Sequence, residues 1–230
     1  QNLVNMSIIN AINEDKEEVN MEDVGEARDR ILMGISKKNY VASDMRRFST
    51  SLHEAGHTLV CYLSPICKKT LHKLTIIPRG PAEGVTFMLP NEDALQSKEE
   101  FLSTIDTAMG GHVAEELWFG KENTRAGCSS DLNKATKMAE AMVKNLGMYS
   151  TDTGYIYVDE GNDDAPEKVS ENYKAKIDET VKLILKDSRD RVFNLLKLHA
   201  NDLKNISQKV FQYDTLTSNI IFYFLYINFV

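Results

Sequence analysis

The sequence has no long apolar run. A membrane-spanning helix needs about 18 or more consecutive apolar residues, and no such stretch occurs in the 230 residues. The longest uncharged apolar segment, residues 220–230 (IIFYFLYINFV), is too short to cross a bilayer. We therefore predict no transmembrane helix within this chain.

Cysteine is also scarce. The three cysteines, Cys61, Cys67 and Cys128, are odd in number and form no C-x-x-C pair. This count disfavours a disulfide framework or a four-cysteine zinc site, and it indicates buried thiols or a reducing compartment.

The formal net charge of -7, with both signs mixed along the chain, leaves no basic stripe for a phosphate backbone. Nucleic acid is therefore not expected as a partner.

Apolar residues at helical spacing are the main pattern in the sequence. Hydrophobic residues make up 42% of the chain, which is enough for one substantial core. Ser97 with Glu100 forms a capping-box pattern, and Gly120 and Gly147 follow two of the periodic segments. Ser129 or Ser130 is expected to cap the helix that leads to Gly147. Helices are predicted at residues 6–13, 21–33, 43–63, 97–118 and 129–146, with two more between 167 and 208 that break near 199–201.

Two short segments rich in β-branched residues lie between these helices. Residues 73–78 (KLTIIP) and 84–89 (GVTFML) flank the turn-forming residues 79–81. Such segments are typical of strands joined by a turn. The predicted fold class is therefore mainly α with a small β-sheet.

An H-E-x-x-H motif occurs at residues 53–57 (HEAGH), inside a predicted helix. Residues four apart lie on one face of a helix, so His53 and His57 can reach the same zinc ion. Glu54 is offset by one residue, which places its carboxylate beside the metal, where it can take a proton from zinc-bound water. The motif predicts a catalytic zinc, although two histidines at this spacing can also be structural.

A catalytic zinc needs a third protein ligand and one open position. Glu115 and Glu116 lie on the predicted helix 97–118, and a glutamate from a later helix completes the site in thermolysin-like enzymes. Asp131 lies in the first turn of the predicted helix 129–146, where the helix dipole and free N–H groups favour an ionised carboxylate. Spacing alone does not separate these candidates.

The chain from His53 to Gly147 resembles the protease domain of the FtsH family of membrane-anchored AAA+ zinc proteases. The combination of its motifs, in this order and at this spacing, is far more specific than H-E-x-x-H alone. The matching segments are HEAGH, TIIPRGPAEGVTFMLP, GGHVAEELWFGKENTRAGCSSDL and NLGMYS, at residues 53–57, 75–90, 110–132 and 145–150.

This resemblance implies a division of the chain and a ligand set. Residues 1–40 would be the end of the AAA+ lid subdomain and its linker, and residues 41–217 a helical zinc metalloprotease domain. Zinc would be the cofactor and Asp131 its third ligand, with Glu115 supporting the site. Glu54 would act as the general base of an endopeptidase that degrades unfolded, misassembled or membrane proteins.

The resemblance also implies a larger machine. The family couples proteolysis to ATP-driven unfolding in a hexameric ring, but this chain has no G-x-x-x-x-G-K-[ST] sequence. We therefore expect a fragment, with the site for ATP and Mg²⁺, and also the membrane anchor, outside this chain. Residues 121–132 (KENTRAGCSSDL) most resemble the mitochondrial inner-membrane i-AAA type, whose catalytic domain faces the intermembrane space. Another organelle or a bacterial membrane is the alternative location.

Three features depart from the family pattern. Thr58 stands where alanine is common, and His112 where arginine or lysine is usual; we expect His112 to be a surface or packing residue rather than a ligand. Residues 218–230 form an apolar tail without a recognised counterpart. The tail is interpreted as a lineage-specific extension, a misread gene end or a helix that packs into the domain, and we expect it to be dispensable for zinc binding.

Peptide binding is predicted at the second strand segment, at Gly84, Val85, Thr86 and Phe87. An exposed strand edge near the zinc can hold an unfolded peptide through backbone hydrogen bonds. An ordinary sheet strand explains the same residues equally well. The competing function for the whole chain is an inactive zinc-binding scaffold for oligomer assembly, and Glu54 argues against it because a scaffold needs no general base.

Overall fold

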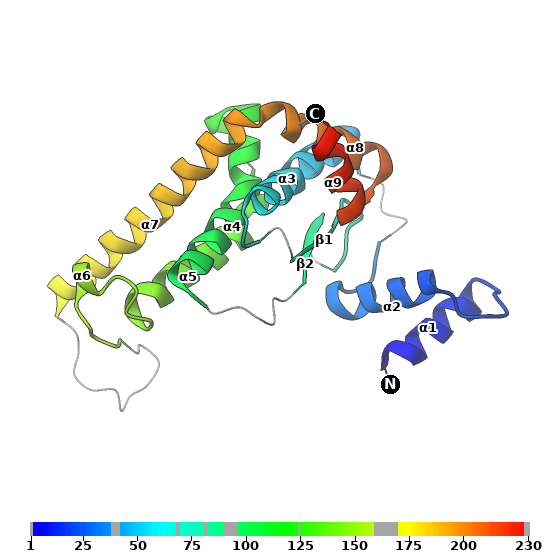
Figure 1. Ribbon diagram of the computed structural model, residues 1–230, viewed down its shortest axis with the longest axis horizontal. Helices are drawn as coiled ribbons and strands as arrows, with labels where there is room; N and C mark the ends of the chain where they lie inside the picture. Colours follow the sequence, from blue (N-terminus) through cyan, green and yellow to red (C-terminus); the bar gives the residue numbers. More distant parts are fainter. Residues whose placement is uncertain are drawn as a thin grey trace.

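The computed structural model describes residues 2–37, 42–67, 70–80, 82–89, 96–123, 125–158 and 170–227. Within these ranges the protein is mainly α-helical with a small antiparallel sheet, which confirms the predicted fold class. Figure 1 shows the helices gathered into one body, with a hairpin of the first two helices beside it. The helices are α1 (Asn2–Asn13), α2 (Met21–Met33), α3 (Asp44–Leu63), α4 (Lys98–Phe119), α5 (Ser129–Lys144), α6 (Ser150–Thr153), α7 (Glu171–Leu198), α8 (Ala200–Tyr213) and α9 (Ser218–Ile227), with short 3-10 helices at Lys121–Asn123 and Ala126–Cys128.

The helix that carries the H-E-x-x-H motif, α3, lies at the centre of the fold. The side chain of Ser43 caps it by accepting a hydrogen bond from the Arg46 N–H, so the helix begins where the sequence predicts. Its neighbours are α4 and α8 on two sides and two strands on another. Leu52 and Leu59 on α3 are fully buried in the core. This enclosure holds the motif in a fixed position.

Two glycines allow α3 and α4 to cross closely. A Cβ atom at Gly110 would lie 2.8 Å from the carbonyl oxygen of Gly56, and a Cβ atom at Gly56 would collide with the carbonyl oxygen of Gly110. Any side chain at either position would force the two helices apart. The crossing brings the backbone of α4 against the helix face that carries the motif.

The sheet has three strands in the order β2-β1-β3, both pairs antiparallel. β1 (Leu71–Thr75) and β2 (Val85–Met88) correspond to the two predicted strands, and Leu74 opposes Thr86 in their register. β3 (Thr215–Thr217) was not predicted; it follows the left-handed residue Asp214, which ends α8. β2 is an edge strand of this sheet.

The apolar tail of the chain is partly a packed helix. Ile221 and Leu225 of α9 are fully buried, and the Phe222 ring lies 5.4 Å from that of Tyr62 on α3. Burial of the apolar face of α9 accounts for the apolar composition of this segment. Of the three interpretations, packing into the domain describes the tail up to Ile227. Among the described residues, no helix combines the length and apolarity that a bilayer crossing requires.

The hairpin of α1 and α2 reaches the rest of the protein through charged side chains. Asp29 of α2 is buried and forms ion pairs with Lys73 of β1 and, at 3.9 Å, with Arg79. Arg79 also pairs with Glu26 at 3.3 Å. These contacts connect the N-terminal hairpin to the sheet, while the division of the chain at residues 40 and 217 stays a prediction.

Two local expectations are wrong. Cys61 and Cys67 form a disulfide, with Cα atoms 4.9 Å apart, and only Cys128 is a free buried thiol. The Ser64-Pro65 turn folds the chain back at the end of α3, which brings two cysteines six residues apart within bonding reach. The cysteine count could not reveal this pairing. At the start of α5, neither Ser129 nor Ser130 is the cap, because the helix begins at Ser129 and Cys128 precedes it without a side-chain cap.

Candidate metal centre and active-site cleft

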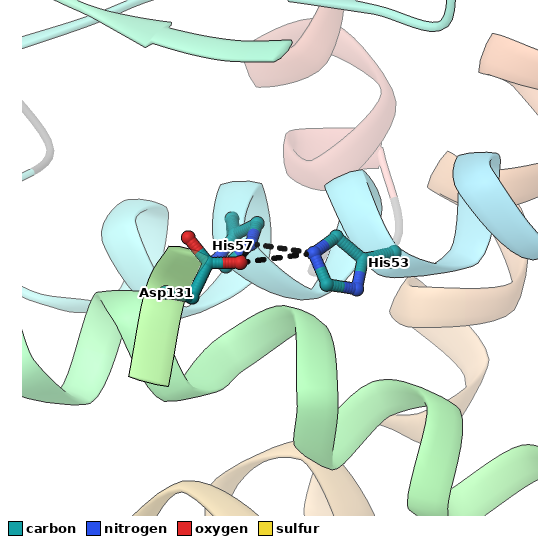
Figure 2. Close-up of side chains that lie close together, drawn as sticks. All are labelled: His53, His57 and Asp131. Atoms are coloured by element: carbon teal, nitrogen blue, oxygen red, sulfur yellow. Dashed lines mark hydrogen bonds and ion pairs between the residues drawn. The ribbon is translucent and has the colours of Figure 1, made fainter. Parts of the chain in front are cut away.

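Three side chains from two helices converge on one point. His53 and His57 come from one face of α3, and Asp131 comes from the first turn of α5. Figure 2 shows the two imidazole rings and the carboxylate turned toward one another. The structure thus brings together the three residues proposed as zinc ligands, from positions 78 residues apart in the sequence.

The donor atoms of these residues form a nearly equilateral triangle. His53 Nε2 lies 3.1 Å from His57 Nε2 and 3.2 Å from Asp131 Oδ2, and the third side, from His57 Nε2 to Asp131 Oδ2, is 3.3 Å. Ligands at the 2.0–2.1 Å typical of zinc are about 3.3 Å apart in a tetrahedral site. The triangle therefore matches one face of a zinc tetrahedron, and all three residues line an open cleft.

The other ring nitrogens are held by acceptors. His53 Nδ1 lies 2.7 Å from Glu115 Oε1, and His57 Nδ1 lies 2.7 Å from the carbonyl oxygen of Thr107, both on α4. When each Nδ1 donates its proton to these oxygens, each Nε2 keeps a lone pair for a metal. Two lone pairs 3.1 Å apart repel, so this arrangement fits a cation between them. The residues present therefore fit zinc.

Glycine at position 111 makes room for both imidazoles. A Cβ atom there would lie 2.5 Å from His53 Nε2 and 2.6 Å from His57 Nε2. Such distances are far below van der Waals contact, so any side chain would displace the donor atoms. α4 therefore supports the site through its backbone, as well as through Glu115 and Thr107.

The charges of His53 and Asp131 depend on each other. Burial of His53 opposes its protonation, but hydrogen bonds with Asp131 and Glu115 outweigh this effect and raise the pKa of His53 to about 10. Burial acts against ionisation of Asp131, and the two histidines overcome it, so the pKa of Asp131 lies well below its usual range. The Asp131 carboxylate therefore stays ionised, as a metal ligand must be.

The two glutamates weighed as third ligands have different partners. Glu115 is buried, and its Oε2 also accepts a hydrogen bond of 3.3 Å from the Arg125 N–H, which links His53 to the segment that leads to α5. Glu116 forms an ion pair with Arg189 of α7, away from the donor triangle. Neither carboxylate belongs to the three-residue group, nor does His112, which lies on α4.

The donor triangle opens into a cleft of about 1230 Å³. One side, here called the helical wall, carries His53, His57 and Asp131 on α3 and α5. A second part of the lining, the strand wall, includes Gly84 and the β2 residues Val85, Thr86 and Met88. Phe87, the fourth residue predicted to bind peptide, does not line the cleft; its ring packs against His72, with centroids 5.8 Å apart.

Glu54 lies between the two walls. Its side chain is mostly buried, lines the cleft, and accepts a hydrogen bond of 2.8 Å at Oε2 from the Thr86 hydroxyl. Sequence reasoning missed this contact, as it missed the Thr107 carbonyl behind His57. A hydrogen bond from a strand 32 residues away leaves no periodic signal in the sequence, and a backbone acceptor leaves none at all.

Comparison with known proteins adds independent information. The model of Peptidase family M41 matches residues 40–222. Similar curated proteins include the ATP-dependent zinc metalloprotease FTSH 11, chloroplastic/mitochondrial, of Arabidopsis thaliana (37% identical over 221 residues, 96% of this chain and 26% of that protein), the mitochondrial inner membrane i-AAA protease supercomplex subunit YME1 of Saccharomyces cerevisiae (38% over 221 residues, 96% and 29%), and the ATP-dependent zinc metalloprotease FtsH of Rickettsia bellii (36% over 227 residues, 96% and 35%). The chain spans 26–35% of the length of these relatives.

Proposed function

Because the chain belongs to peptidase family M41 and is a zinc metalloprotease domain of the FtsH type, we propose that it cleaves unfolded polypeptides with His53, His57 and Asp131 as zinc ligands and Glu54 as general base. The observation that carries this proposal is the triangle of three donor atoms 3.1–3.3 Å apart, beside a glutamate that lines the same cleft. Glu54 immediately follows a ligand on the same helix, so its carboxylate is within reach of the reacting water.

The division of labour follows from these positions. When bound, zinc polarises a carbonyl and makes water more acidic. Glu54 accepts the proton from the attacking water and can pass it to the leaving nitrogen. Glu115 and the Thr107 carbonyl keep both imidazoles in the tautomer that presents Nε2, and Asp131 supplies the anionic ligand.

We place the peptide along the strand wall. β2 is an edge strand, so a substrate in extended conformation can add to it through backbone hydrogen bonds, which favours unfolded chains over folded ones. Gly84 lies against the catalytic glutamate, since a Cβ atom there would be 2.8 Å from Glu54 Cγ. The absence of a side chain lets the backbone of this segment approach the base closely, so a peptide paired with β2 would lie near Glu54.

The function of the whole protein is proposed from its relatives. Their names describe ATP-dependent zinc metalloproteases, and in yeast a mitochondrial inner-membrane i-AAA subunit. We propose that this domain works in an ATP-dependent, membrane-anchored hexamer of the mitochondrial inner membrane, with the protease facing the intermembrane space. Bacterial relatives also match, so a bacterial membrane is the alternative, as is another organelle. Immunogold labelling of the protein in its own cells would distinguish these locations.

Zinc analysis combined with casein cleavage tests the chemistry. Casein is largely unfolded and needs no unfoldase, so the chain can be assayed directly. In Glu54→Gln, zinc content should equal that of the wild type while cleavage falls by several orders of magnitude. Undiminished cleavage by this variant would refute the role of Glu54, and a zinc-loaded wild type without activity would favour the scaffold function.

A further inference from the structure

Two hydroxyl groups, that of the buried Thr58 and that of the half-buried Thr86, form a chain of hydrogen bonds that ends on the catalytic glutamate. The Thr86 hydroxyl lies 2.8 Å from Glu54 Oε2 and 3.0 Å from the carbonyl oxygen of the same residue. The Thr58 hydroxyl, one turn further along α3, lies 3.3 Å from the Thr86 hydroxyl. Thr58 is fully buried and Glu54 is 7% exposed, so bulk water competes little for these groups.

The direction of the chain follows from the chemistry of its members. An ionised carboxylate only accepts hydrogen bonds, so Thr86 must donate its single proton to reach Glu54 Oε2. This is the charge-assisted and shorter of its two contacts with Glu54, and it is the stronger for that reason. The Thr86 oxygen keeps lone pairs that can accept the proton of Thr58. Thr58 therefore donates to Thr86, and Thr86 donates to Glu54.

Fixing one carboxylate oxygen leaves the other for catalysis. Oε2 of Glu54 is held by Thr86, whereas Oε1 accepts no hydrogen bond from any residue in the described part of the chain. A Cβ atom at Gly84 would lie 3.0 Å from Oε1, so that oxygen points toward the strand wall of the cleft. A glutamate side chain has three rotatable bonds, and a fixed Oε2 restricts them to orientations that present Oε1.

We propose that Thr86 is a positioning residue for Glu54, and that Thr58 holds the Thr86 hydroxyl in its donating orientation. The proposal rests on the proposed function, in which Glu54 is the base. It has a consequence for substrate binding, because Thr86 belongs to β2. The strand that receives the peptide also orients the base, so base and peptide keep a fixed relation to each other.

The test compares hydroxyl removal at Thr86 with hydroxyl retention. Zinc content, melting temperature, kcat and KM are measured on the zinc-loaded chain with an unfolded fluorogenic peptide. Thr86→Val should lower kcat about 100-fold, the usual scale for a misplaced catalytic group, with KM within about twofold and zinc unchanged. Thr86→Ser keeps the donor and should restore kcat to within about threefold of the wild type. Thr58→Val should lower kcat about threefold to tenfold.

A hydroxyl elsewhere in the same sheet provides the control. The Thr75 hydroxyl of β1 lies 2.8 Å from that of Thr215 and makes no contact with Glu54. Thr75→Val should therefore leave kcat unchanged, even if the melting temperature falls. Equal losses of kcat in Thr75→Val and Thr86→Val would overturn the proposal, as would unchanged kcat in Thr86→Val or equal impairment of Thr86→Val and Thr86→Ser.

A double-mutant cycle separates this inference from the proposed function. If Thr86 acts through Glu54, Thr86→Val should not lower the residual rate of Glu54→Gln any further. An additional loss in that background would show that Thr86 acts independently of the base and would overturn the inference alone. Full activity of Glu54→Gln itself would instead overturn the proposed function. If Thr86→Val fails to fold, the predicted loss in Thr58→Val, absent in the Glu54→Gln background, decides the question.

Discussion

The helical wall and the strand wall of the cleft are built on different principles. The helical wall brings charged side chains together in the interior and fixes them from behind, with Glu115 and the Thr107 carbonyl holding the imidazoles. The strand wall contributes backbone, a glycine and one hydroxyl. From this comparison we expect zinc affinity and catalytic rate to depend on separate sets of residues, which meet at Glu54.

The most damaging change to the helical wall should be loss of a ligand. His57→Ala removes one corner of the donor triangle, and we expect zinc affinity to fall more than about 100-fold, beyond the 10- to 100-fold typical for changes to partners of the ligands. Zinc bound after dialysis, measured by atomic absorption, checks this. His112→Ala is the matched control on α4 and should keep its zinc; loss of metal there would mean that the three-residue group is incomplete.

Alanine substitutions at Gly111 and Gly84 test the helical wall and the strand wall independently. Gly111→Ala places a methyl group against both imidazoles, so zinc should bind more weakly and cleavage should fall about 100-fold. Gly84→Ala crowds Glu54 from the opposite side, so we expect cleavage to fall about tenfold with zinc retained. Gly25→Ala on α2 meets nothing within 4 Å and should affect neither. Zinc loss in Gly84→Ala would contradict the separation of the walls.

Substitutions at the adjacent residues Glu115 and Glu116 should have smaller effects, and these effects should differ in kind. Glu115→Gln weakens the acceptor behind His53, and zinc affinity should fall about 10-fold to 100-fold. Glu116→Gln breaks the ion pair with Arg189 instead, so the melting temperature should fall while zinc affinity stays the same. Competition with a chromogenic chelator measures the affinities. Identical effects of the two variants would show that Glu115 has no special role in the site.

The smallest effect on the cleft is expected from α9. Ile221→Ala removes a fully buried side chain and should lower the free energy of unfolding by about 2–5 kcal/mol. Urea denaturation gives this value, with the exposed Tyr223→Ala as control. Zinc content should not change in either variant, because α9 packs on β1, β3 and α8, and on Tyr62 near the end of α3, rather than on the donor residues. A drop in zinc content in folded Ile221→Ala would tie the tail to the site.

The difference between the walls also explains what the sequence could predict. Helical spacing placed His53 and His57 on one face, and the Ser97–Glu100 capping box marked the start of α4. Asp131 was expected in a first helical turn, but the choice between Asp131 and Glu115 depended on family resemblance. The geometric reason is that α3 and α4 cross at Gly56 and Gly110, which sets Glu115 against His53 Nδ1 and outside the donor triangle.

Other features depend on contacts that no local pattern encodes. β3 has only three residues, too few for a periodic signal, and forms because α8 ends at Asp214 alongside β1. The Cys61–Cys67 disulfide depends on the turn after α3. Thr86 was predicted as a peptide-binding residue and Thr58 noted only as unusual, yet the pair meets over Glu54 once β2 packs on α3.

Removal and return of the metal tests the central claim most directly. The chain is stripped with a chelator, dialysed, and assayed for casein cleavage before and after addition of one equivalent of zinc, with circular dichroism to verify that it stays folded. The account predicts that cleavage disappears with the metal and returns with the added zinc in the wild type but not in Glu54→Gln. Cleavage that persists in the folded, zinc-free chain would contradict it.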